Sequence, residues 1–99
     1  MLIAVLDLRT TTADRPVARA QLDREKDEIR AMPGNLDFRV YVARDDEEVV
    51  VVIHEWADES SFAGYLSSDA FARSGAVLRP LVTEPPVSRR FRAALLETV

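Results

Sequence analysis

The chain has 99 residues, 47% of them hydrophobic, and this length predicts one domain spanning residues 1–99. The chain has no cysteine, which excludes disulfide bridges and thiolate metal sites. Its 13 basic and 17 acidic residues argue against nucleic acid as a partner. No apolar run approaches the ~18 residues of a membrane span, and the apolar N-terminus has no basic lead-in, so we expect a cytoplasmic protein without a signal peptide.

The first predicted element is a strand at Leu2–Arg9. Alternation places Leu2, Ala4, Leu6 and Leu8 on one face of this strand. The other face carries Ile3, Val5, Asp7 and Arg9. Both faces begin apolar, which indicates a strand covered on two sides. Asp7 either emerges into solvent where the strand ends or points into a pocket there.

A helix is expected next. Asp14 is a suitable N-cap, Pro16 suits the first turn, and the helix should run to about Met32. Its core-facing stripe at helical spacing consists of Ala18, Leu22, Ile29 and Met32. Glu25 falls within this stripe. We expect it at the helix edge, paired with Arg15 or another basic residue; the alternative is a carboxylate facing a cavity, with a raised pKa.

Two strands should then form an antiparallel hairpin. Pro33-Gly34 ends the helix, Leu36–Ala43 alternates like a half-buried strand, and Arg44–Glu48 predicts the hairpin loop. The second strand, Val49–Trp56, opens with an apolar run, so both of its faces should be covered. Helices on one side of a sheet cannot cover both faces. The simplest cover for the open face is a second copy of the chain.

The end of this second strand carries the only histidine and the only tryptophan. Alternation places His54 and Trp56 on the same face as Val50 and Val52. Asp58 can cap the helix that follows, whose apolar side is predicted to hold Phe62, Tyr65 and Leu66. Ser67-Ser68 interrupts this helix, and Ser68 can cap a second helix carrying Phe71, Ala72, Gly75 and Leu78.

The chain should close with a strand at Val87–Leu95 and an apolar tail that could serve an interface. Arg89, Arg90 and Arg92 are expected at a solvated strand edge or a dimer contact, with an anionic-substrate role as the alternative. The order strand, helix, strand, strand, helix, strand predicts the α+β ferredoxin-like fold, a four-stranded antiparallel sheet with helices on one face. The apolar open face predicts a homodimer packed sheet against sheet.

The segment HEWADESSFAGYLSSDAF, followed by VLRPLVTEPP and a last strand, resembles the antibiotic biosynthesis monooxygenase superfamily of dimeric α+β barrels. Pro33-Gly34 before a strand, with an aromatic residue at Phe38, also fits. The resemblance implies one of several activities. Some members oxygenate anthrones or quinols with O₂ and neither metal nor flavin, others bind or degrade haem, and others isomerise small signalling molecules. Its motifs mark the fold more than the activity.

Haem degradation fits this sequence poorly. In the haem-degrading members, a ligating histidine follows the Ser-Asp-x-Phe motif, where this chain has Ser74-Gly75. Those members also use an asparagine near the end of the first strand, where this chain has Asp7. We therefore expect no cofactor, with haem as a minor alternative, and a single histidine without cysteine makes metal catalysis improbable.

The leading hypothesis is a cofactor-independent monooxygenase for a quinol- or anthrone-like aromatic. His54 would act as the base and Trp56 would supply an apolar face and an N–H donor. The remaining candidates would bind the substrate: Asp7, Arg39, Phe62, Tyr65 and Phe71. The alternatives are a non-enzymatic dimer that binds a small apolar ligand or haem, and a structural member of the fold without a ligand.

Overall fold

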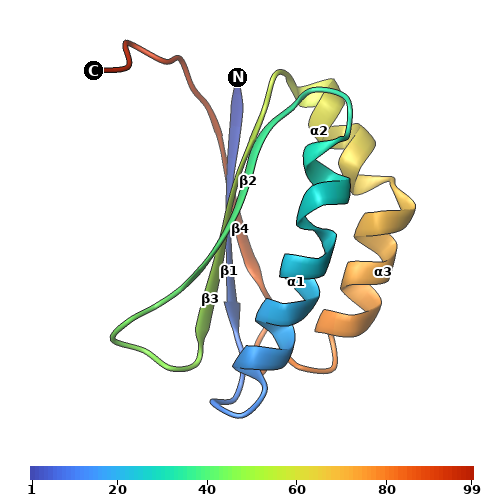
Figure 1. Cartoon of the computed structure of the whole chain (residues 1–99), viewed down its shortest axis with the longest axis vertical. Coiled ribbons are helices and arrows are strands. Elements are labelled where there is room, and N and C mark those ends of the chain that lie inside the picture. The colour runs from blue at the N-terminus through green and yellow to red at the C-terminus, as the bar shows by residue number, and fades with distance from the viewer.

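The computed structural model describes all 99 residues. Its element order is the one the sequence predicts, including the division of the second helical region into two helices. The elements are β1 (Leu2–Arg9), α1 (Arg15–Arg30), β2 (Asn35–Val42), β3 (Val49–Trp56), α2 (Glu59–Leu66), α3 (Asp69–Leu78) and β4 (Val87–Arg92). All three helices lie on one side of the sheet (Figure 1). The α+β ferredoxin-like fold is thus confirmed. No helix has the length and apolar character needed to cross a membrane.

The four strands form one antiparallel sheet in the order β2-β3-β1-β4. β3 therefore lies inside the sheet, between β1 and the edge strand β2. Leu2 pairs with Trp56, and Phe38 pairs with His54. This register brings the end of β3 beside the starts of β1 and β2.

The core lies between the sheet and the helices. β1 and β3 alternate as expected, so their even-numbered side chains face the helices. The fully buried side chains with the largest volumes include Trp56, Phe38 and Ile29. The core cluster consists of Leu2, Ala4, Leu8, Ala18, Leu22, Ile29, Phe38, Val50, Val52, Trp56, Phe62, Tyr65 and Leu78.

Two expected helix caps are confirmed. The Asp58 carboxylate accepts a hydrogen bond from the Ser61 N–H at 2.8 Å, and the Ser68 hydroxyl accepts one from the Phe71 N–H at 3.2 Å. Each satisfies a backbone donor that a helix start would otherwise leave unpaired. The Asp14 side chain makes no such bond, although the residue occupies the cap position of α1.

Several predicted boundaries and faces were wrong. α1 ends at Arg30, with Ala31 as its cap, because residues just before Pro33 disfavour the helical conformation. β4 ends at Arg92 and not at Leu95, since its partner β1 begins at Leu2, which pairs with Arg92. The buried face of α3 consists of Ala70, Ser74 and Leu78, and not of the stripe through Phe71 and Ala72.

The position of Glu25 also differs from the expectation. Its side chain is buried, accepts a hydrogen bond from Gln21 Nε2 at 2.7 Å, and forms no ion pair. Its Oε2 is the one buried side-chain polar atom without a hydrogen-bond partner. Glu25 therefore lies on the core-facing stripe of α1, where helical spacing places it, and not at the helix edge, where a carboxylate is usually found.

The turn between α1 and β2 requires a glycine. Gly34 has φ 78°, and its carbonyl accepts a hydrogen bond from the Ala57 N–H at 2.8 Å. A Cβ at this position would lie 2.0 Å from Ser61 Oγ. Both the left-handed backbone and the close approach of α2 therefore depend on the missing side chain.

We expect Gly34→Ala to lower the free energy of unfolding by about 2 kcal/mol, because alanine is strained at positive φ and its methyl group would displace Ser61. Gly64→Ala is the matched control. It lies in α2 with nothing within 4 Å of its added Cβ, and it should raise stability by about 0.5–1 kcal/mol. Urea unfolding of both variants measures the difference, and equal stabilities would contradict this account of the turn.

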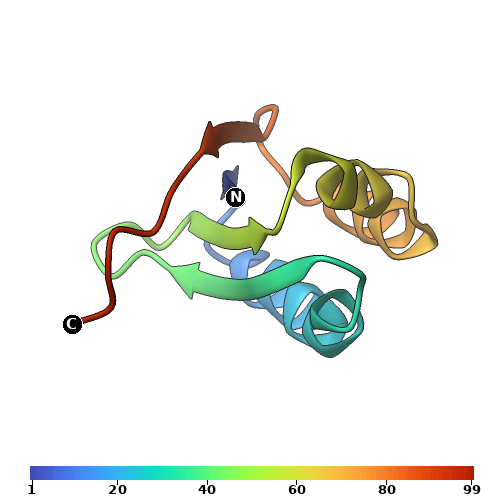
Figure 2. The ribbon, with the colours of Figure 1, turned by 90° about the horizontal axis from the view of Figure 1, so that it is seen from above.

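The face of the sheet away from the helices has no cover within the chain. It exposes large apolar side chains from β2, β3 and β4, including Tyr41, Ile53, Val87 and Phe91. The C-terminal tail leaves β4 and extends on the side away from the helices (Figure 2). Its Leu95, Leu96 and Val99 are also exposed.

Candidate active site

The candidate site is built around His54, near the end of β3. His54 is 4% exposed and faces the helices, in the company of aromatic side chains from three elements. Its ring centroid lies 5.6 Å from the centroids of Phe38 on β2 and of Phe62 and Tyr65 on α2. The sequence grouped Phe62 and Tyr65 with His54 correctly, because the capped start of α2 follows β3 directly.

Trp56 fixes the protonation pattern of His54. The indole Nε1–H donates a hydrogen bond to His54 Nδ1 at 2.9 Å. Indole is a donor only, so Nδ1 must be the unprotonated nitrogen, and a neutral His54 carries its proton on Nε2. Trp56 itself is completely buried and packs against Tyr65 with ring centroids 5.2 Å apart. It lies behind His54 and is not part of the cavity wall.

The surroundings of His54 keep it uncharged. Burial is the main cause, and the positive charge of Arg90 adds to it; together they lower the pKa of His54 to about 4. At neutral pH the imidazole therefore presents an N–H group. A weakly basic ring whose Nε2 already carries a proton is better suited to donate a hydrogen bond than to act as the general base that the sequence suggested.

A cavity of about 300 Å³ opens beside His54, between the sheet and α3. A recess of about 150 Å³ adjoins it and shares Leu6, His54, Tyr65, Phe71 and Pro86 with it. The cavity wall consists of Leu6, Leu8, Leu22, Phe38, Val52, His54, Tyr65, Phe71, Ser74, Gly75, Leu78, Arg79, Val82 and Pro86. The wall is mostly apolar, with few polar groups, which is typical of small-molecule sites.

The predicted aromatic residues divide between the two spaces. Tyr65 and Phe71 line both, and Phe62 lines the recess only. Phe71 is 40% exposed and contacts Tyr65 edge-on, with centroids 5.2 Å apart, so it covers the mouth and does not fill the core. Burial and the negative charge of Glu25 raise the pKa of Tyr65 to about 12, so its phenol stays protonated.

Asp7 and Arg39 are not brought to this cavity. Both lie on the open face of the sheet, where Asp7 is 3.7 Å from Arg89 and Arg39 pairs with Asp37. Strand alternation explains this placement, since each is one residue out of step with its cavity-lining neighbours.

Apart from Phe71, the sequence did not reveal the part of the wall that α3 and its end contribute. Ser74, Gly75 and Arg79 line the cavity with Pro86, which precedes β4. The spacing of Ala70, Ser74 and Leu78 could have identified the buried face of α3, but the more apolar neighbouring stripe was the stronger signal. No group of three His, Cys, Asp or Glu side chains is placed to hold a metal ion.

The chain is similar to known proteins in both sequence and structure. Residues 1–76 match the family model described as antibiotic biosynthesis monooxygenase. No curated protein sequence matches the chain. Similar solved structures share the fold at low identity. A proposed antibiotic biosynthesis monooxygenase from Nitrosomonas europaea is 13% identical, over 96% of this chain and 100% of that one, with a TM-score of 0.90. Rv0793 from Mycobacterium tuberculosis is 19% identical, over 99% and 98%, with a TM-score of 0.87.

Proposed function

The chain belongs to the antibiotic biosynthesis monooxygenase family, and on this premise we propose that it is a cofactor-independent monooxygenase acting on a quinol- or anthrone-like aromatic. The observation that supports this most is the apolar, aromatic-lined cavity with the neutral imidazole of His54 on its wall. Such a site can hold a flat ring, exclude water and hydrogen-bond to one oxygen of the ring.

The reaction makes modest demands on the protein. A ring CH₂ or phenol loses a proton, and the resulting anion transfers one electron to O₂. Recombination gives a peroxide, which eliminates water and leaves a carbonyl. One oxygen atom of O₂ enters the product, and the other leaves as water together with two substrate hydrogens. No outside reductant is needed, because the substrate supplies all the electrons.

In this proposal His54 stabilises the substrate anion. Its Nε2–H donates a hydrogen bond to the substrate oxygen on which negative charge develops, and Trp56 holds the tautomer that makes this possible. Arg90, whose charge already acts on His54, adds a favourable potential. Phe38, Phe62 and Tyr65 hold the ring. The proton itself leaves to solvent at the cavity mouth.

Haem does not fit His54 in this arrangement. An iron ligand would need the lone pair of Nε2, which would move the proton to Nδ1, against the Trp56 N–H. A non-catalytic dimer that binds a small apolar ligand in the same cavity is the remaining alternative. It differs from the oxygenase only in turnover.

Oxygen uptake by the metal-stripped protein separates these functions. We expect saturable uptake above the autoxidation background with at least one member of a panel of hydroquinones and anthrones. Reduced uptake in a Phe38→Ala variant would connect the activity to this cavity, since Phe38 is on its wall. Binding of a panel member without uptake would support the alternative.

We further propose that the active form is a homodimer packed through the open sheet face. The exposed apolar side chains on that face support this, since an apolar patch of this extent is typical of an interface. The exposed tail beyond β4 extends on the same side and could add to the contact.

Ile53→Lys places a charge at the centre of the open face and should convert the dimer to a monomer, because the buried ammonium group would lack a partner. Asp27→Lys, on the exposed side of α1, introduces the same side chain away from this face and should leave the dimer intact. Sedimentation equilibrium measures both masses. A wild-type monomer, or a dimer that survives Ile53→Lys, would overturn the proposed interface.

A further inference from the structure

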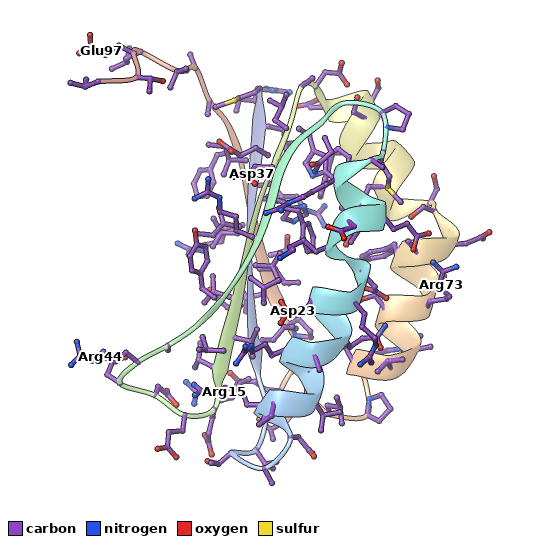
Figure 3. The ribbon with its side chains drawn as sticks, in the orientation of Figure 1. Arg15, Asp23, Asp37, Arg44, Arg73 and Glu97 are labelled. Atoms are coloured by element: carbon purple, nitrogen blue, oxygen red, sulfur yellow. The ribbon has the colours of Figure 1, made fainter.

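Arg79 and Arg90 differ from most arginines of the chain in having no acidic partner. Seven arginines pair with carboxylates: Arg9, Arg19, Arg30, Arg39, Arg73, Arg89 and Arg92. Arg73 lies on α3 near Arg79 in sequence, yet it points outward and is neutralised by Glu28 at 2.8 Å (Figure 3). Five arginines have no carboxylate partner: Arg15, Arg24, Arg44, Arg79 and Arg90. Of these, only Arg79 and Arg90 line the cavity or its recess.

Each guanidinium is placed at the edge of the apolar space. The Arg79 side chain folds back over its own helix, so that Nη1 lies 2.8 Å from where a Cβ on Gly75 would be. Arg90 stacks over Phe62 at 4.9 Å from the ring centroid and donates to Ser88 Oγ at 3.3 Å. Glycine at position 75 thus leaves room for one cation, and an aromatic ring supports the other.

No acidic residue lines either space, although the chain has 17 acidic residues and a net charge of −4. A protein with a net negative charge repels anions on average. A mostly apolar cavity whose charged wall residues are arginines alone is therefore a local exception. Planar guanidinium groups recognise carboxylates through paired N–H donors, and they do so best where the surroundings are apolar.

We infer that the cavity selects an aromatic ligand carrying a carboxylate, with Arg79 as its main anchor and Arg90 as a supporting charge. Arg79 is the main anchor because its guanidinium makes no hydrogen bond or ion pair within the chain. Arg90 is already engaged with Ser88 and Phe62. This deepens the proposed function by naming the substrate class, but it concerns binding alone and can be tested without turnover.

Calorimetric titration with 2-naphthoate and with its neutral isostere 2-naphthamide tests the inference. The wild type should bind the carboxylate about 10-fold more tightly than the amide, as one charge-assisted contact predicts. Arg79→Gln should reduce this ratio to near unity, and Arg90→Gln should reduce it partly. Arg44→Gln is the matched control. Arg44 lies in the β2–β3 hairpin loop, far from the cavity and without an ion pair, so the ratio should not change (Figure 3).

Gly75→Ala provides a second test that keeps the charge. Its methyl group would displace the Arg79 guanidinium, which can move because it is the end of a flexible side chain. We expect the ratio of the two affinities to fall in this variant too, because the Arg79 guanidinium is displaced. An unchanged ratio would mean that a diffuse positive field, and not the position of Arg79, favours the carboxylate. Equal affinities of the wild type for the two ligands, absence of binding by both, or a ratio that survives Arg79→Gln would each overturn the inference. Oxygen uptake with neutral hydroquinones would remain a separate test of the oxygenase.

Discussion

His54→Phe should lower turnover about 100- to 1000-fold, the usual cost of removing one preorganised donor from a developing oxyanion. Phenylalanine keeps the aromatic packing around position 54 but provides no N–H for the substrate and no acceptor for Trp56. His54→Gln is the informative companion, because its amide supplies both a donor and an acceptor. We expect it to recover part of the lost rate in the same oxygen-uptake assay.

Trp56→Phe extends this prediction to the tautomer. Without the indole N–H, nothing holds the proton on Nε2, so the ¹⁵N chemical shifts of the imidazole should show a mixture of tautomers in place of one. The rate should fall less than in His54→Phe. An imidazole protonated on Nδ1 in the wild type would contradict the proposed role of Trp56, and equal rates in wild type and His54→Phe would contradict the proposed role of His54.

The stability of the fold should fall as the solution is acidified from pH 7 toward pH 4. His54 titrates near its ordinary pKa of ~6.5 in the unfolded chain but has a pKa of about 4 in the folded state. Between these values the unfolded chain binds more protons. The free energy of unfolding therefore decreases as pH falls, by about 2 kcal/mol at pH 5 and about 3 kcal/mol once the folded state titrates.

The difference between wild type and His54→Phe isolates this contribution. Carboxylates with lowered pKa, such as Asp58 at the start of α2, also lose their stabilising effect in acid, but they do so equally in both proteins. Urea unfolding at pH 7 and pH 5 should show a steeper loss in the wild type. Parallel losses would mean that His54 is not held neutral by its surroundings.

Much of the fold could be predicted because local signals agreed with one another. The alternation of Val49–Trp56, the caps at Asp58 and Ser68 and the proline-glycine turn each point to the same topology. The alternation also placed His54 and Trp56 on one face correctly. One error occurred at a strand end, where pairing decides the outcome: β4 stops where its partner β1 begins. Others concerned which side chains a helix buries, namely Glu25 on α1 and the inward face of α3.

The chemistry of the site was harder to predict. Whether His54 is a base or a donor depends on one hydrogen bond from Trp56, and residues two apart on a strand give no information on which ring nitrogen is engaged. Nothing in the sequence marks Arg79 as an anchor for a ligand. Its proposed role depends on the absence of an acidic partner and on the space that Gly75 leaves for its guanidinium. Such features come from packing between elements and not from local pattern.

The most direct test of the proposed oxygenation is the fate of ¹⁸O₂. Metal-stripped protein should be incubated under ¹⁸O₂ with the best substrate of the panel and quenched early, and the product examined by mass spectrometry. The account predicts one ¹⁸O atom per product molecule, formed at a rate that falls sharply in His54→Phe. Unlabelled product with stoichiometric hydrogen peroxide, or labelling that His54→Phe leaves unchanged, would contradict it.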